Sequence, residues 1–134
     1  MGMILLAYDG SEHSRKALDK AISMSGEEDK IIVLYVIPKA ILNEFKELEP
    51  QINRAKAWDI VNKAIEIIIA REKQGIAVVR EGDIAEEIIH YAKELECSLI
   101  LIGSKGISKI GRFSLGSVAE AVAKNAETAV LIIK

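Results

Sequence analysis

The sequence has little of several features that mark specialised classes of protein. A single cysteine, Cys97, excludes an internal disulfide and a multi-cysteine metal site, which fits a reducing compartment. With 18 basic and 20 acidic side chains, the formal net charge of −2 gives no attraction to nucleic acid or an anionic membrane. Apolar runs such as residues 31–37 fall short of the roughly 18 residues that a membrane span needs. Residues 1–7 are too short for the apolar core of a signal peptide. We therefore expect a cytoplasmic protein that binds neither nucleic acid nor membrane.

What the sequence does have is enough apolar residues for one core. Hydrophobic residues make up 50% of the 134 positions, and the length is typical of a single domain over residues 1–134. Short runs rich in isoleucine, valine and leucine alternate with longer segments of helical period. This alternation is typical of an α/β domain whose parallel strands are joined by crossover helices. The predicted strands are residues 3–8, 30–37, 76–80, 98–102 and 129–133.

The segments between these strands carry helix signals. Ser11 is a candidate N-cap for a helix over 11–25, and Gly75 is predicted to stop a long helix over 51–73 that places Trp58 on its apolar stripe. Asp83 and Ser117 each precede a glutamate by three residues, which is the capping-box pattern of a helix start. Residues 38–50 contain both prolines and show no single period, so their structure stays open.

Right-handed crossovers restrict such a chain to a few doubly wound sheets, and we predict the five-stranded order 3-2-1-4-5. In that order the direction of winding reverses between the first and fourth strands, and ligands bind beyond the carboxyl ends of the strands at such a point. Asp9 follows the first strand and Gly103 follows the fourth. The topology therefore brings these two residues together at a candidate binding crevice.

Residues 103–117 have the composition of a phosphate-binding loop. They include four glycines and the basic residues Lys105, Lys109 and Arg112, without one acid. Glycines let main-chain N–H groups approach an anion closely, and the helix predicted from Ser117 would add its positive end. The alternative is a surface loop in which the glycines make turns and Ser117 caps its helix. Asp9 likewise has two readings, as a cap of the first helix or as an acceptor for sugar hydroxyls or a hydrated metal ion.

The common nucleotide signatures are absent. The segment lacks the G-x-x-x-x-G-K-[ST] pattern of P-loop proteins, and the first strand is followed by "AYDGSE" rather than by a G-x-G-x-x-G turn. Neither of these two phosphate-binding schemes therefore applies to this chain.

The sequence resembles the universal stress protein family, in its ATP-binding form, over nearly the whole chain. The nucleotide motif of that family, G-x2-G-x9-G-[ST], is matched at Gly103, Gly106, Gly116 and Ser117. Further similar pieces are "AYDGSEHSRKAL", "VLYVIP", "GDIAEEII", "SLILIGSKG" and "GSVAEAV", in this order.

The resemblance implies a role for each matching position. Asp9 would contact the ribose or adenine, and the main chain around Ala7 and Val36 would border the adenine. Ile102, Gly103 and Gly106 would lie along the ribose and α-phosphate, and Gly116, Ser117 and Val118 would hold the outer phosphates. The implied ligand is ATP, with ADP or AMP as alternatives and Mg²⁺ or Mn²⁺ on the phosphates. Tyr35, Ile84 and Lys105 depart from residues that are frequent in the family, which bears on affinity.

The resulting hypothesis is an ATP-binding regulatory or stress-response protein that switches with nucleotide and acts on an unknown protein partner. No residue stands out as a base for activating water, so we expect at most very slow hydrolysis and no catalytic residue. His13 and His90 have no second ligand at fixed spacing and are expected to be solvated or structural. The apolar final strand, "AVLIIK", would be a sheet edge, which predicts a homodimer paired through it. The alternative function is a homodimeric interaction module that needs no nucleotide.

Overall fold

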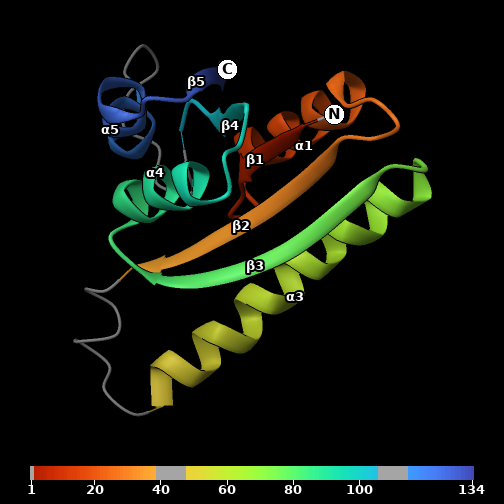
Figure 1. The fold of residues 1–134 in the computed structure, drawn as a ribbon. Helices are drawn as coiled ribbons and strands as arrows, with labels where there is room; N and C mark the ends of the chain where they lie inside the picture. Colours follow the sequence, from red (N-terminus) through yellow and green to blue (C-terminus); the bar gives the residue numbers. More distant parts are fainter. Residues whose placement is uncertain (1, 39–47, 106–114) are drawn as a thin grey trace.

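The computed structural model describes residues 2–38, 48–105 and 115–134 (Figure 1). Its elements, in chain order, are β1 (Met3–Ala7), α1 (Glu12–Met24), β2 (Lys30–Pro38), α3 (Leu48–Ala70), β3 (Gln74–Gly82), α4 (Ile84–Glu94), β4 (Leu99–Gly103), α5 (Ser117–Asn125) and β5 (Ala129–Ile133). The strands form one five-stranded sheet in the order β3-β2-β1-β4-β5, and every pairing is parallel. The predicted fold class and strand order are confirmed.

Helices cover both faces of the sheet. On one face, α1 and α3 pack Leu18, Ile22 and Ile68 against strand residues such as Leu6 and Val33. On the other face, α4 and α5 bury Ile88 and Val122 against a second set of strand residues that includes Leu5 and Ile32. The three inner strands, β2, β1 and β4, are largely buried, which is why each reads as a nearly continuous apolar run.

The long helix α3 differs from its prediction at both ends. It begins at Leu48 rather than Gln51, and it ends at Ala70 because Glu72 takes a left-handed conformation with φ of 62°. Gly75 lies inside β3 and does not stop the helix. A Cβ at Gly75 would lie 3.0 Å from Ile65 Cδ1 and 3.1 Å from Ile68 Cδ1, so this glycine lets α3 pack closely on the strand. Trp58 lies beside the buried stripe rather than in it and is 40% exposed.

The edge strand β3 is longer than predicted, at Gln74–Gly82 instead of 76–80. None of its residues is buried. Polar side chains are therefore tolerated at its ends, and they interrupt the apolar run by which a strand is recognised in the sequence. In the part of the chain that the structure describes, no helix has the length and apolar character needed to cross a membrane.

Candidate functional site

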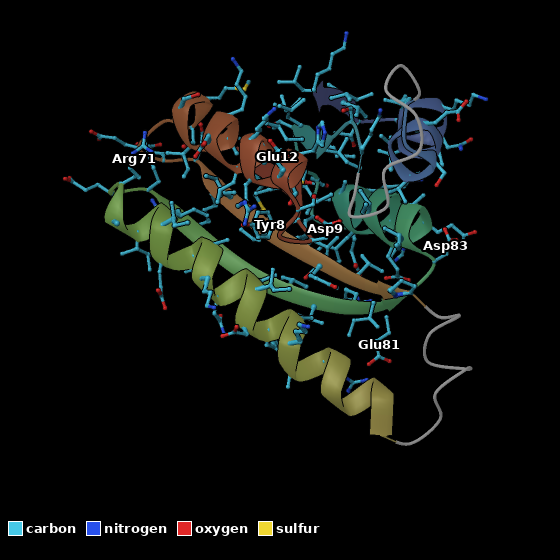
Figure 2. The ribbon with its side chains drawn as sticks, turned by 180° about the vertical axis from the view of Figure 1, so that it is seen from behind. Tyr8, Asp9, Glu12, Arg71, Glu81 and Asp83 are labelled. Carbon is cyan, nitrogen blue, oxygen red and sulfur yellow. The ribbon has the colours of Figure 1, made fainter. Side chains whose placement is uncertain are left out.

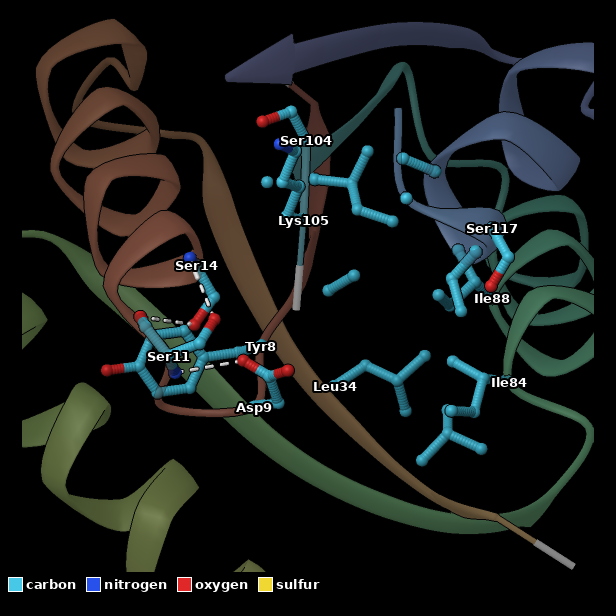
Figure 3. Close-up of a pocket in the computed structure, with 17 residues that line it drawn as sticks. Tyr8, Asp9, Ser11, Ser14, Leu34, Ile84, Ile88, Ser104, Lys105 and Ser117 are labelled. Carbon is cyan, nitrogen blue, oxygen red and sulfur yellow. Dashed lines mark hydrogen bonds between the residues drawn. The ribbon is translucent and has the colours of Figure 1, made fainter. Parts of the chain in front are cut away.

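A pocket of about 300 Å³ opens at the carboxyl ends of β1 and β4, where the winding of the sheet reverses (Figure 3). This is the position that the topology predicts for a ligand. The residues that line it are Ala7, Tyr8, Asp9, Ser11, Ser14, Leu34, Val36, Ile84, Ile88, Ile102, Gly103, Ser104, Lys105, Gly116, Ser117, Val118 and Ala119.

The turn from β1 to α1 forms a polar wall of the pocket. Asp9 Oδ1 accepts a hydrogen bond from the N–H of Ser11 at 2.9 Å, and Ser11 Oγ accepts one from the N–H of Ser14 at 3.3 Å. Ser11 is therefore the N-cap of α1, as predicted, and Asp9 orients that cap through its main chain. Figure 2 shows Tyr8 and Asp9 where β1 ends beside the first turn of α1. The carboxylate of Asp9 is thus held in one place at the edge of the pocket.

Two phenols near Asp9 stay neutral at physiological pH. Burial raises the pKa of Tyr8, which lines the pocket, and the nearby negative charge of Asp9 adds to that effect. Burial also raises the pKa of Tyr35, and the charge of Asp9 raises it further. Among the described residues that line the pocket, Asp9 is the one carboxylate.

The opposite wall is apolar. Leu34 and Val36 from β2 and Ile84 and Ile88 from α4 line it, and Figure 3 shows Leu34 beside Ile84. Ile88 and Leu34 are at most 1% exposed, so this wall belongs to the core beneath it. A flat apolar ring fits such a wall, because burying its faces removes apolar surface from water without leaving polar atoms unpaired.

The start of α5, with its first main-chain N–H groups, lies at the pocket. Its N-cap is Gly116, with φ of −63° and ψ of 152°, and no side chain of the described residues caps it. Ser117, Val118 and Ala119 follow as the first three helical residues, and all three line the pocket. The first N–H groups of a helix have no acceptor within it, and the helix dipole is positive there. An anion in the pocket could accept hydrogen bonds from these N–H groups and would be stabilised by the helix dipole.

This helix start corrects one prediction. Ser117 is the first residue of α5 and not its N-cap, because the N–H of Glu120 donates to the carbonyl of Gly116 at 2.9 Å. Gly116 takes the cap position because its own N–H donates to the carbonyl of Ser104 at 2.7 Å, which fixes the chain just before the helix. The hydroxyl of Ser117 takes no part in capping and is exposed at the pocket.

Two glycines of the motif are required by packing. A Cβ at Gly103 would lie 2.7 Å from His13 Cβ and 2.8 Å from the carbonyl carbon of His13. A Cβ at Gly116 would lie 2.9 Å from the carbonyl oxygen of Ser104. These glycines therefore let α1, the end of β4 and the start of α5 meet around one side of the pocket.

The structure brings together eight of the nine residues that the sequence singles out. Ala7, Asp9, Val36, Ile102, Gly103, Gly116, Ser117 and Val118 all line the pocket. Gly106 lies outside the described residues, as do Lys109 and Arg112 of the basic loop.

Sequence reasoning missed the contribution of Ser14, Ile88 and Ser104 to this pocket. Ser14 and Ile88 lie outside the motif, and only the packing of α1 and α4 on the sheet brings them to it. Ser104 stands inside the motif at a position where the motif specifies no residue type. Among the described residues, no group of three or more histidine, cysteine, aspartate or glutamate side chains could hold a metal ion.

Fold and site together define an α/β protein with a pocket at the switch point of its sheet, one wall polar and one apolar. The model of the universal stress protein family matches residues 1–134. The chain therefore belongs to the universal stress protein family.

Individual relatives agree with this assignment. Universal stress protein YxiE of Bacillus subtilis is 30% identical over 98% of this chain and 97% of its own length. Hypothetical protein MJ0577 has a solved structure that superposes with a TM-score of 0.90, at 24% identity, over 99% of this chain and 95% of that one. The universal stress protein from Archaeoglobus fulgidus, solved in complex with dAMP, has a TM-score of 0.75 and 24% identity over 100% of this chain and 98% of that one.

Proposed function

We propose that this protein is a cytoplasmic stress-response protein that binds an adenine nucleotide in the pocket. Nucleotide binding then switches its interaction with a protein partner. The observation that carries the proposal is the start of α5, which has no side-chain cap among the described residues and lines a pocket that also has an apolar wall. A nucleotide has the matching parts, a phosphate for the helix start and a flat base for the apolar wall. Solved proteins of similar fold contain cAMP, dAMP or AMP.

Each site residue then has a defined contact. Asp9 accepts hydrogen bonds from the ribose, and the main chain at Ala7 and Val36 borders the adenine. Ile102 and Gly103 lie along the ribose and the α-phosphate, with Gly106 assigned there from the motif alone. The helix start at Gly116, Ser117 and Val118 faces the α-phosphate from the other side of the pocket and binds the phosphates beyond it.

ATP is the proposed ligand, with ADP and AMP as alternatives. The described lining of the pocket offers one carboxylate, Asp9, and Asp9 Oδ1 already accepts the N–H of Ser11. These residues do not form a metal site of their own, so Mg²⁺ or Mn²⁺ would be bound chiefly by the phosphates and enter with the nucleotide.

Hydrolysis is proposed to be very slow or absent. A base that activates water must lie within hydrogen-bond reach of it and be free to take its proton. The described pocket lining contains no histidine, and Asp9 belongs to the ribose side rather than the phosphate side of this arrangement. Nucleotide occupancy, rather than turnover, then carries the signal.

A homodimer paired through β5 is part of the proposal. This strand is an edge of the sheet, and Val130, Leu131, Ile132 and Ile133 are only half-buried in the monomer. Apolar edges of this kind are normally covered or paired. Sedimentation equilibrium at micromolar concentration should give twice the mass of one chain, and a monomeric mass would contradict the dimer.

The binding proposal is tested by calorimetric titration of the purified protein with ATP, ADP, AMP and adenosine, each with and without Mg²⁺. We expect a one-to-one complex with at least one of the nucleotides and weaker binding of adenosine, which lacks the phosphate. Mass spectrometry of small molecules released by denaturing the fresh protein would identify a nucleotide carried through purification. A dimer that binds none of these compounds would favour the alternative, an interaction module that needs no nucleotide.

A further inference from the structure

Ser104 is a buried serine at which four elements of the fold meet. It follows β4 directly, lines the pocket and is 7% exposed. Its hydroxyl lies 3.3 Å from Nδ1 of His13, a residue of α1 that stands 91 positions earlier in the chain. His13 is not among the residues that line the pocket. This hydrogen bond joins the first turns of α1 to the loop that leaves β4.

The main chain of Ser104 is held on two further sides. Its N–H donates to the carbonyl of Ile133 at 2.7 Å, which ties it to the end of β5. Its carbonyl accepts from the N–H of Gly116 at 2.7 Å, which ties it to the start of α5. The side chain adds the tie to α1. Ser104 thus fixes the position of Gly116 relative to the body of the protein.

The contact between Ser104 and Gly116 leaves little freedom. The position of a Cβ on Gly116 would be 2.9 Å from the carbonyl oxygen of Ser104 and 3.3 Å from Cα of Lys105. A rotation or shift of Ser104 therefore moves Gly116, and with it the first N–H groups of α5. The direction in which these donors point decides how well they bind an anion.

We infer that His13 is a positioning residue for the phosphate side of the nucleotide pocket and acts through its hydrogen bond to Ser104. This inference rests on the nucleotide binding proposed above. His13 does not touch the nucleotide. It holds Ser104 in the orientation that aims the start of α5 at the phosphate.

The imidazole and the backbone of His13 have separable effects. Gly103 packs against the main chain and Cβ of His13, and that contact survives any replacement that keeps a Cβ. A serine hydroxyl can donate or accept, so its bond to Nδ1 holds with either tautomer of the imidazole. Asparagine carries a polar side-chain atom at nearly the position of Nδ1, whereas alanine carries none. His13→Asn should therefore keep the link that His13→Ala removes.

The test compares the dissociation constants of AMP and adenosine for the full chain. Losing one hydrogen bond of ordinary strength corresponds to a change of about three- to tenfold. We expect His13→Ala to raise the dissociation constant of AMP by about that factor. The dissociation constant of adenosine should rise by less than about twofold, because adenosine has no phosphate for α5 to bind. His13→Asn should bind AMP within about twofold of the parent.

Two controls separate this effect from a general loss of stability. His90→Ala removes the other histidine, an exposed residue on α4 whose Nε2 lies 3.7 Å from Glu94, and should leave both dissociation constants unchanged. Ser104→Ala should weaken AMP binding as much as His13→Ala does. The double variant should lose no more AMP affinity than either single variant, because the two substitutions remove the same hydrogen bond. Thermal unfolding of each variant confirms that it is folded at the temperature of the titration.

The outcomes are distinct. Equal weakening of AMP and adenosine in His13→Ala, or additive losses in the double variant, would overturn the inference and leave the proposed function standing. An unchanged AMP affinity in both His13→Ala and Ser104→Ala would do the same. Failure of the parent protein to bind any nucleotide would refute the proposed function itself, and the inference with it.

Discussion

The two ends of the sheet satisfy their polar groups in different ways. At the amino end, the carboxylate of Asp29 accepts the N–H of Gly2 at 2.9 Å and that of Gly26 at 2.7 Å, and Lys73 Nζ donates to the carbonyl of Ser25 at 2.6 Å. At the carboxyl end, the start of α5 has no side-chain cap within the part of the chain that the structure describes. One end is closed by the chain itself, and the other presents main-chain donors to a pocket. Under the proposed function, the amino end serves the fold and the carboxyl end serves a ligand.

The ionisable groups follow the same division. The two N–H groups on Asp29 lower its pKa, so that a carboxylate that is charged at neutral pH closes the turn at the amino end. At the carboxyl end, burial raises the pKa of Tyr8 and of Tyr35 and keeps both phenols neutral. In Figure 2, Arg71, which follows α3 at the amino end, lies far from Asp83, which precedes α4 at the carboxyl end. Variants at the two ends can therefore be compared as distant, independent sites.

The largest effect is expected at Gly103, where the carboxyl end is packed most tightly. Gly103→Ala should lower the free energy of unfolding by about 2–3 kcal/mol, because its Cβ would overlap the backbone of His13. Gly26→Ala is the matched change at the amino end, where the new Cβ would meet Asp29 Oδ2 at an ordinary 3.5 Å. It should change stability by less than about 1 kcal/mol. Denaturant unfolding measures both, and equal losses would contradict the account.

The next effect concerns the ligand alone. Ser117→Asp places a carboxylate at the first helical residue of α5, where it occupies the positive pole and repels a phosphate. AMP affinity should fall at least about tenfold, while stability without ligand stays the same or rises by about 0.3–1 kcal/mol. Ser23→Asp carries the same change in charge to an exposed residue at the far end of α1 and should leave AMP binding intact. If the two variants bound AMP alike, α5 would not be the phosphate site.

A smaller effect is expected at the start of α4, which has a side-chain cap, unlike the described start of α5. Asp83 accepts the N–H of Glu86 at 3.0 Å at the start of α4. Asp83→Ala should cost about 1 kcal/mol of stability, the usual value of an N-cap, and leave AMP affinity unchanged. Thermal unfolding and titration measure the two quantities on the same sample. A loss of affinity without a loss of stability would show that the carboxylate of Asp83 serves the ligand instead.

The smallest effect is a pH dependence at the amino end. The pKa of Asp29 is lower in the folded protein than its ordinary value of 3.8, so its contribution to stability is present above that value and is lost as the pH falls through the folded pKa. Asp29→Asn should therefore unfold at a slightly lower temperature than the parent at pH 6. The difference should vanish in strong acid, and a constant difference across this range would contradict the assignment.

Much of the fold could be predicted from the sequence because its signals are local. The inner strands are apolar on both faces, and Ser11 and Asp83 stand at the helix starts that they cap. The edge strand β3 was too short in the prediction because its ends, such as Gln74 and Glu81, are exposed polar residues. Trp58 was placed on the apolar stripe because helical period alone does not tell the centre of a buried stripe from its margin.

The candidate site divides in the same way. The glycine motif and Asp9 could be found from sequence, since strand order and spacing bring them together. The cap of α5 could not, because the choice of Gly116 over Ser117 depends on a hydrogen bond to Ser104. His13 was expected to be solvated or structural, and its hydrogen-bond partner could not be named from the sequence. Its partner is 91 residues away, at a distance that only the packing of α1 on β4 can close.

The most direct measurement of the central claim is a titration of the ¹⁵N-labelled protein with AMP and with adenosine, followed by NMR. The account predicts that the amide signals of Ser117, Val118 and Ala119 shift strongly with AMP and only weakly with adenosine, while those of Gly2 and Gly26 stay in place. Amides at the start of α5 that do not move at saturating AMP would contradict it.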